Sequence, residues 1–291
     1  MNYKFGIAVG VVSTFFYSLM DTLIKYLEIN DMINNDTLFF QGSLIIFVIL
    51  LLSGIIYYKK MFYITNVKAT ICRAIITFMN FYLAFYVLKY IPLDIYYSII
   101  FTVPTIASVL AVFFLKEQFN LAKVSALFIG FIGVLIIANP FAESFNNSYI
   151  PYILLTLLLA FTTALSGLIT RKYLSKENSF AVSFYIILLC VILGFMISSN
   201  NQGIKTTLNF DYNIFILMLA LCLCWIVGLL LFLKAYQITP LQIIAPTEYT
   251  FIIWGIILSY VVFDYQTSLM IILGCSLIIC SNFISLLFNK E

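Results

Sequence analysis

The residue with the clearest chemical potential is Glu248, a carboxylate inside an apolar stretch, Leu241 to Phe263, of bilayer-spanning length. It follows Leu241 by 248 − 241 = 7 positions, which is about 10 Å along a helix. Pro246 has no amide hydrogen, so we expect it to free the carbonyl of Gln242 and to kink the helix. The Glu248 carboxylate, the freed carbonyl and the Gln242 amide would then line one polar pocket.

A carboxylate shielded from bulk water in this way could bind an ammonium or sulfonium group, or carry a proton. Two structural alternatives remain open for Glu248. One is an ion pair with Arg73 or Lys234, and the other is a hydrogen bond that locks helix packing. The variant Glu248→Gln separates these readings, because transport and its pH dependence would both survive if the carboxylate had no direct role.

A stripe of polar residues runs along the first apolar stretch, where Thr14, Ser18, Asp21 and Lys25 follow one another at steps of 4, 3 and 4. This spacing places them on one helical face, which we expect to line a cavity or the bundle interior. Asp21 and Lys25 could form a gate that pairs when the cavity closes on that side. The alternative is an ordinary pair within the helix, with Lys25 reaching towards the lipid headgroups.

The third apolar stretch repeats this pattern with Arg73, Thr77 and Asn80. Arg73 lies near the inner edge, where it could anchor the topology, join an ion pair or gate, or bind a ligand. Asn80 lies deeper and is a candidate lining residue, although a hydrogen bond between helices accounts for it equally well.

Aromatic residues make up 18% of the chain, and most of them are expected to pack helices together or to lie at the membrane interface. Some lie within the apolar stretches and could contact an organic solute, with cation–π attraction if the solute is positive. Packing alone is the alternative for each. The set consists of Tyr17, Tyr82, Tyr86, Trp225, Tyr249 and Trp254.

The composition argues against several kinds of site. There is no histidine, the commonest metal ligand and general base, and the six cysteines show no zinc or redox spacing. No Gly-x-x-x-x-Gly-Lys-Ser/Thr run is present to hold ATP phosphates. We therefore expect no catalytic residue, no metal and no cofactor. A dispersed net charge of +3 gives no indication of a nucleic-acid partner.

The elements that must position these residues are membrane-spanning helices, because 64% of the residues are apolar and only 9% are charged. Backbone amides in hydrocarbon have no partner except each other, so a span is a helix of roughly 20 residues. We predict an all-α polytopic membrane protein with ten spans: Phe5–Leu27, Leu38–Tyr58, Ala69–Leu88, Leu93–Leu115, Leu121–Ala138, Tyr149–Ile169, Phe180–Ser199, Ile214–Leu233, Leu241–Phe263 and Ser268–Phe288.

The basic residues predict the orientation of these spans. With a cytoplasmic N-terminus, 12 of the 15 lysines and arginines lie on the inner side or at inner helix ends, and Lys25, Lys89 and Lys205 are the exceptions. Both termini are therefore predicted to be cytoplasmic. The first span is too long for the core of a signal peptide and lacks a small-residue cleavage pattern, so we expect it to be retained.

The two halves of the chain carry matching segments. Residues 23–27 match 170–174 at an offset of 172 − 25 = 147, and residues 90–94 match 238–242 at 240 − 92 = 148. These matches predict one repeat over residues 1–145, with helices 1 to 5, and a second over residues 146–291, with helices 6 to 10. Since each repeat has an odd number of helices, the second copy must be inverted, which is typical of transporters.

The same offset relates Glu248 to Ile100, whose carbonyl is freed by Pro104 in the fourth span. Both symmetry-related helices are therefore expected to bend near the depth of the site. Pro104 and Pro246 are predicted hinges, and a static kink absorbed by packing is the alternative.

Several segments resemble EamA-type members of the drug/metabolite transporter superfamily, and the resemblance covers essentially the whole chain. Where the family usually has Phe-Gly-Glu, this chain has Phe263-Asp264-Tyr265, so no role is carried over to that loop carboxylate. The stretch Ala245–Tyr249 is also similar to S-adenosylmethionine transporters of intracellular bacteria. The resembling segments are residues 84–90, Pro104, 113–117 and 130–135 in the first half, and 234–236, 245–250 and 262–264 in the second.

Together these patterns predict a secondary transporter of a small amine-bearing metabolite, such as an amino acid or S-adenosylmethionine, working by alternating access in a bacterial inner membrane. The predicted partners are the solute and the lipid bilayer, with the chain a monomer or a homodimer. Export of drugs or cationic metabolites is the alternative function. A membrane-embedded enzyme is disfavoured without histidine, and a channel or non-transporting partner would not need an inverted duplication.

Overall fold

The computed structural model describes residues 3–57, 62–88, 102–116, 121–138 and 150–263, with isolated positions from 90 to 100 and from 270 to 284. Every element in these ranges is helical. In chain order they are α1 (Tyr3–Ile29), α2 (Asn35–Tyr57), α3 (Val67–Leu88), α5 (Val103–Leu110), the π-helical η2 (Ala111–Leu115), α6 (Leu121–Ala138), α7 (Ile150–Tyr173), α8 (Ser179–Gln202), α9 (Ile204–Thr207), α10 (Phe215–Ile238), α11 (Leu241–Ile244), the 3₁₀ segment η4 (Ala245–Tyr249) and α12 (Thr250–Phe263).

Six of these helices, α1, α2, α3, α7, α8 and α10, are long and apolar enough to cross a membrane. Each coincides with a predicted span, to within a few residues at its ends. Helix α6 has the predicted bounds. The predicted span Ser268–Phe288 and the first part of Leu93–Leu115 lie largely outside the described residues.

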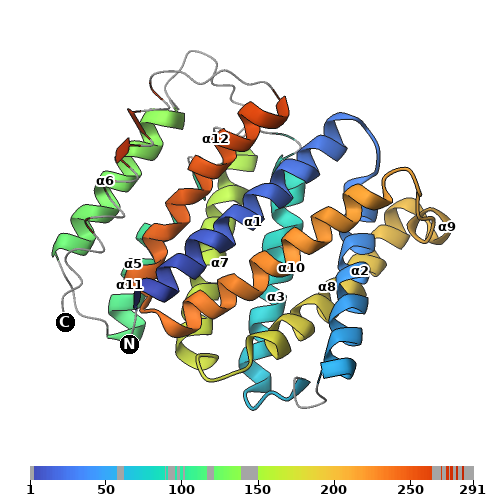
Figure 1. The fold of residues 1–291 in the computed structure, drawn as a ribbon, viewed down its shortest axis with the longest axis horizontal. Coiled ribbons are helices and arrows are strands. Elements are labelled where there is room, and N and C mark those ends of the chain that lie inside the picture. The colour runs from blue at the N-terminus through green and yellow to red at the C-terminus, as the bar shows by residue number, and fades with distance from the viewer. Residues whose placement is uncertain are drawn as a thin grey trace.

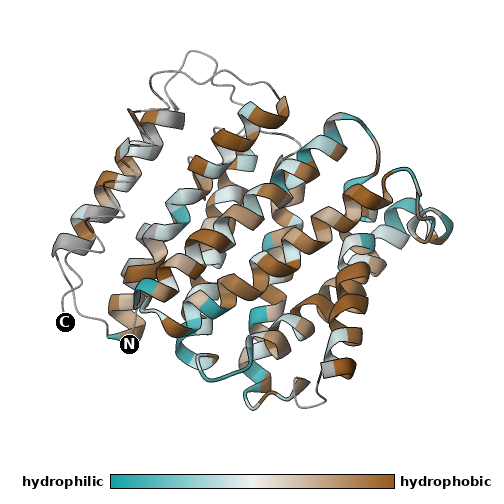
Figure 2. Ribbon diagram, in the orientation of Figure 1, coloured by the Kyte–Doolittle hydropathy of each residue, from teal (hydrophilic) through white to brown (hydrophobic). Residues whose placement is uncertain are grey.

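The helices form one bundle in which α1 lies between α10 and α12, while α2 packs on α8 and α3 packs on α7 (Figure 1). Figure 2 shows hydrophobic residues along the lengths of the helices and hydrophilic residues at the turns. Large apolar side chains also point outward, such as Ile216 at 79% exposed and Ile56 at 75%. An outer surface of this kind suits hydrocarbon as its solvent.

The predicted span Leu241–Phe263 is divided into α11, η4 and α12. The 3₁₀ segment begins at Ala245 and carries Pro246 in its first turn. Because proline has no amide hydrogen and clashes with the preceding turn, regular α-helical bonding is interrupted here. The departure from α geometry therefore lies where the sequence predicts a kink, directly at Glu248.

The fourth predicted span is also interrupted. Thr102 forms a turn with Ile99, and α5 begins at Val103, so Pro104 lies in the first turn of a helix, where its missing amide hydrogen costs no internal bond. The segment ends in η2, and Lys116 then adopts a left-handed backbone with φ 53°.

Two glycines bring the start of α1 against the segment that carries Glu248. A Cβ atom added at Gly6 would lie 1.8 Å from Thr239 Oγ1, and one added at Gly10 would lie 2.7 Å from Ile244 Cδ1 and 2.8 Å from Thr247 Oγ1. The small-residue pair thus permits a close helix contact, as such pairs do in membrane proteins.

Candidate functional site

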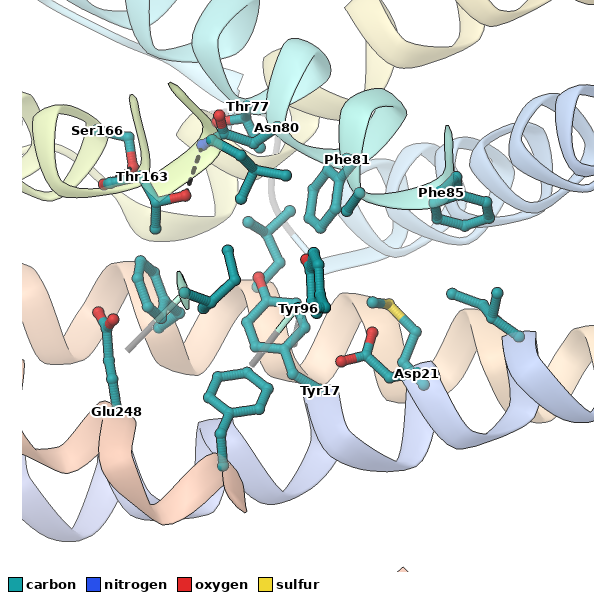
Figure 3. A pocket seen from close by; sticks show the side chains of 18 of the residues that line it. Tyr17, Asp21, Thr77, Asn80, Phe81, Phe85, Tyr96, Thr163, Ser166 and Glu248 are labelled. Carbon is teal, nitrogen blue, oxygen red and sulfur yellow. Dashed lines mark hydrogen bonds between the residues drawn. The ribbon is translucent and has the colours of Figure 1, made fainter. Parts of the chain in front are cut away.

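A cavity of about 160 Å³ lies in the interior of the bundle. Its walls come from α1, α3, α7, α10, the η4 and α12 segment, and two positions before α5. Most lining residues are apolar or aromatic, and a small number of polar groups converge on it, which is the usual composition of a ligand site. The polar lining residues, apart from tyrosines, are Arg73 and, labelled in Figure 3, Asp21, Thr77, Asn80, Thr163, Ser166 and Glu248.

Glu248 is placed at the cavity by the 3₁₀ segment, and its side chain is 7% exposed. Its carboxylate accepts a hydrogen bond from the Tyr236 hydroxyl on α10. The Tyr236 ring stacks on Phe232, with centroids 4.4 Å apart, and lies against α7 where a Cβ added at Gly167 would be 2.5 Å from Tyr236 Cε1. The sequence places Tyr236 in a family-like motif but gives no signal that it contacts Glu248.

Neither of the possible ion-pair partners, Lys234 and Arg73, makes the contact that holds Glu248. Lys234 is exposed, whereas Glu248 is buried. Arg73 is 2% exposed and donates from Nε to Thr170 Oγ1 at 2.9 Å and from Nη1 to the Thr77 hydroxyl. Both contacts of the guanidinium are therefore hydroxyl groups, and Arg73 faces the same cavity as Glu248.

Asn80 joins α3 to α7 at the cavity wall. Its amide donates to Thr163 Oγ1 at 3.2 Å (Figure 3). Its oxygen accepts from Thr162 Oγ1 at 2.6 Å. Both predicted roles of Asn80, lining the cavity and bonding between helices, are thus seen together. Thr163 and Ser166 on α7 line the cavity without having been predicted from sequence.

In the view of Figure 3, Tyr17 and Tyr96 lie between Asp21 and Glu248. Tyr17 is 9% exposed and lines the cavity together with the charged side chains of Asp21, Arg73 and Glu248.

The polar stripe of α1 faces the bundle interior, as predicted. Thr14 shares a hydrogen bond of 2.6 Å with Thr250, and Ser18 donates to the Phe251 carbonyl at 3.3 Å. Of the stripe, Asp21 lines the cavity, whereas Ser18 serves the contact with α12. Lys25 is half-buried one turn further along α1.

Some predicted site residues lie away from the cavity lining. Trp225 and Tyr249 are 0% exposed, with Trp225 packed on Phe39 and Phe81, and Tyr86 is 43% exposed beside Tyr90. The side chains of Gln242 and Pro246 lie outside what the structure describes. Among the described residues there is no group of three His, Cys, Asp or Glu residues able to hold a metal ion.

A family model matches most of the chain. The model of the EamA-like transporter family aligns with residues 4–139 and 150–287. One solved crystal structure has a TM-score of 0.82 at 12% identity and covers 98% of this chain and 99% of its own, a likeness that shows the fold.

Individual relatives are also transporters. The S-adenosylmethionine uptake transporter of Rickettsia conorii is 28% identical over 223 residues, which are 74% of this chain and 71% of that protein. The S-adenosylmethionine uptake transporter of Rickettsia bellii is 26% identical over 272 residues, 90% of this chain and 87% of that protein. The pseudopaline exporter CntI of Pseudomonas aeruginosa is 22% identical over 259 residues, 87% of each chain.

Proposed function

Because the chain belongs to the EamA-like transporter family, we propose that it is a secondary transporter of a small amine-bearing solute, with S-adenosylmethionine as the first candidate. The chain is a multi-pass membrane protein, and its family and relatives are transporters, not enzymes. The proposal adds the substrate, transport across a bacterial inner membrane and an alternating-access mechanism.

The observation that carries the proposal is the buried carboxylate of Glu248 in a cavity with aromatic walls. A carboxylate at membrane depth is expensive unless a partner compensates it, and an ammonium or sulfonium group supplies that compensation. Phe81, Phe232 and Phe251 line the cavity, and aromatic side chains there favour a cationic or planar solute.

The proposed division into two inverted repeats, residues 1–145 and 146–291, is supported by the way the cavity is assembled. Its walls come from α1 and α7 and from α3 and α10, which are corresponding helices of the proposed halves. Ile100 and Glu248, paired by the offset of 148, both line it. A site shared by two related bundles can open alternately to either side.

The cavity volume of about 160 Å³ is below the range of about 300 to 1,000 Å³ typical of sites for drug-sized ligands. A nucleoside-sized solute therefore requires the cavity to widen during the cycle. The interruptions at Pro104 and at the η4 segment with Pro246 are the proposed hinges, because such breaks absorb backbone rotation. No ATP motif is present in the sequence, so the proposed energy source is an ion gradient, an exchanged solute or the solute's own gradient.

Uptake of labelled S-adenosylmethionine into proteoliposomes tests the proposal. We expect saturable uptake by the native chain and a loss of at least about tenfold in Glu248→Gln, because a charge-assisted contact of about 1.5–3 kcal/mol is removed. Glu28→Gln, a carboxylate outside the cavity lining, is the matched control and keeps native uptake. Unchanged uptake and unchanged pH dependence in Glu248→Gln would remove the carboxylate from the mechanism.

Export is the second candidate, favoured by the likeness to the pseudopaline exporter. The same proteoliposomes distinguish the directions when the labelled solute is loaded inside and its efflux is compared with uptake at matched gradients. Faster efflux under an inward ion gradient would indicate export of a cationic metabolite, and faster uptake would indicate import.

A further inference from the structure

The cavity contains two buried charges of opposite sign, and neither is neutralised by the contact it makes. The Arg73 guanidinium, 2% exposed, bonds to the hydroxyls of Thr170 and Thr77. The Glu248 carboxylate, 7% exposed, accepts from the Tyr236 phenol. Neutral hydroxyls orient a charged group but supply no counter-charge, and a buried charge is costly without one.

Arg73 is held in a way that suits ligand binding better than anchoring at the interface. It lies six residues after the start of α3 at Val67, about 9 Å along the helix axis. An interfacial anchor extends its charged end into water, whereas this side chain is buried. The two threonines fix the guanidinium from α7 and from the next turn of α3, so its orientation is set before a ligand arrives.

We propose that Arg73 binds the carboxylate of the transported solute, so that the site selects α-amino-acid groups, with Glu248 taking the ammonium. This inference rests on the proposed transport function. A guanidinium presents a planar fork of donors that matches a carboxylate, which a lysine or a polar amide does not reproduce. Arg73 and Glu248 both line the same cavity, so a zwitterion bound there has a group of opposite charge available for each of its own charges.

The geometry accounts for selectivity among related solutes. S-adenosylmethionine has a carboxylate, an ammonium and a sulfonium, whereas its decarboxylated analogue keeps both cations and the adenosine and lacks the carboxylate. A site that merely attracts cations would favour the decarboxylated analogue, because it has the larger positive charge. A site with Arg73 as the carboxylate ligand disfavours it, because the buried guanidinium would be left uncompensated.

The test compares the two solutes in proteoliposomes that contain the full chain. For the native protein we expect the concentration for half-maximal inhibition of labelled uptake to be at least about tenfold higher for the decarboxylated analogue. In Arg73→Gln the value for S-adenosylmethionine rises by a similar factor while that for the analogue stays constant, so the preference disappears. Arg171→Gln changes the chain's other arginine, which bonds to the Gln237 carbonyl outside the cavity lining, and keeps the native preference.

The outcomes separate this inference from the function on which it rests. The native protein could transport S-adenosylmethionine and give the same half-maximal inhibitory concentration for both solutes. That result overturns the role of Arg73 and leaves the transport function standing. The same conclusion follows if Arg73→Gln raises the half-maximal inhibitory concentrations of both solutes by the same factor. Absence of saturable uptake of S-adenosylmethionine and of amino acids by the native protein overturns both. If Arg73→Gln does not fold, the native comparison decides alone, with ligand-induced thermal stabilisation as its second readout.

Discussion

At the scale of single residues, the main feature is the hydrogen bond between Tyr236 and Glu248, the buried carboxylate of the cavity. Its hydroxyl donates to Glu248, and its ring is fixed between Phe232 and the backbone of α7 at Gly167. A donor held so firmly occupies an acceptor position that a solute ammonium would also use. We therefore propose Tyr236 as a positioning residue for Glu248, the proposed ligand of the solute cation.

We predict that Tyr236→Phe changes solute affinity by about 5- to 150-fold, because removing one partner of a buried acceptor is worth about 1–3 kcal/mol. The ring and its packing are retained, so the melting temperature should fall by only a few degrees. Competition binding at several pH values measures the effect, since a freed carboxylate alters the pH profile as well as the affinity. Tyr185→Phe, which loses a hydroxyl bond to the Phe62 carbonyl, is the control. An unchanged pH profile in Tyr236→Phe contradicts the positioning role.

Residue types and spacing predicted Glu248, Asp21 and Asn80 as cavity candidates, because charge and amide groups are rare in membrane helices. They singled out Arg73 mainly as an anchor, ion-pair or gate residue, whereas it lines the cavity. They did not predict Tyr236, Thr163 or Ser166, because hydroxyl groups in such helices bond equally well to their own backbone. Tyr236 lies 248 − 236 = 12 residues before Glu248 and on another helix, so only the fold brings the two side chains together.

At the scale of elements, the position of η4 depends on how closely α1 approaches it. Gly6 and Gly10 leave room for Thr239, Ile244 and Thr247 where a methyl group would overlap them. Because Thr247 directly precedes Glu248, we expect the contact at Gly10 to influence the position of the carboxylate in the cavity as well.

We predict that Gly10→Ala destabilises the protein by about 1–3 kcal/mol, the usual cost of overpacking, and lowers solute affinity at the same time. The added carbon would lie 2.8 Å from Thr247 Oγ1, so η4 must shift or the threonine must rotate. Gly255→Ala on α12 is the matched control, because nothing lies within 4 Å of its added carbon. Melting temperature and ligand affinity, measured on both variants, test the prediction. Equal behaviour of the two variants would show that this contact does not constrain the site.

A second connection between elements joins three chain segments at one end of the bundle. Glu177, in the turn between α7 and α8, accepts from the Thr65 amide at 3.2 Å, the Asn66 amide at 2.9 Å and the Thr65 hydroxyl. The side chain of Gln237, near the end of α10, donates to the carbonyls of Leu174 and Glu177 at 2.8 and 3.1 Å. Opening of the cavity towards this end would require these bonds to break.

We predict that part of the folding stability depends on pH because of the Glu177 carboxyl group. Partial burial raises the pKa of this carboxyl, but hydrogen bonds from the Thr65 side chain and from the amides of Thr65 and Asn66 outweigh it, so the pKa is lowered below its ordinary value. A lowered folded pKa gives stability that is fully present above the unfolded value of about 4.3 and is lost as pH falls through the folded value. Glu177→Gln should therefore melt below the native protein at pH 7, with a difference that shrinks on acidification.

Melting curves in detergent between pH 7 and pH 3 measure this difference. Asp211→Asn, which changes a loop carboxylate that accepts from the Asn213 amide, serves as the control and should leave the acid dependence in place. If the difference in melting temperature between the native protein and Glu177→Gln is the same at pH 7 and at pH 3, titration of Glu177 does not contribute to stability.

At the scale of the whole molecule, hydropathy predicted the spans well because a membrane helix must be apolar over a nearly fixed length. Thus α1, α2, α3, α7, α8 and α10 coincide with predicted spans. The division of Leu241–Phe263 into three segments was predicted only as a kink, since a proline does not specify whether the helix bends or passes into 3₁₀ geometry. Packing partners such as α1 and α10, far apart in sequence, carry no local signal.

The orientation of the bundle in the membrane remains a prediction of the basic residues, and labelling in whole cells tests it. Ser175 lies in the turn before α8 and Tyr212 in the loop after it, and both are exposed, Tyr212 at 91%. Helix α8 has 24 residues and is about 36 Å long, so these positions lie on opposite sides of a bilayer. In a chain whose native cysteines are replaced, a membrane-impermeant maleimide should label Tyr212→Cys in cells whose outer membrane is permeabilised, and Ser175→Cys only after the inner membrane is opened. The reverse pattern would place both termini outside and would show that the 12 inner basic residues do not set the topology.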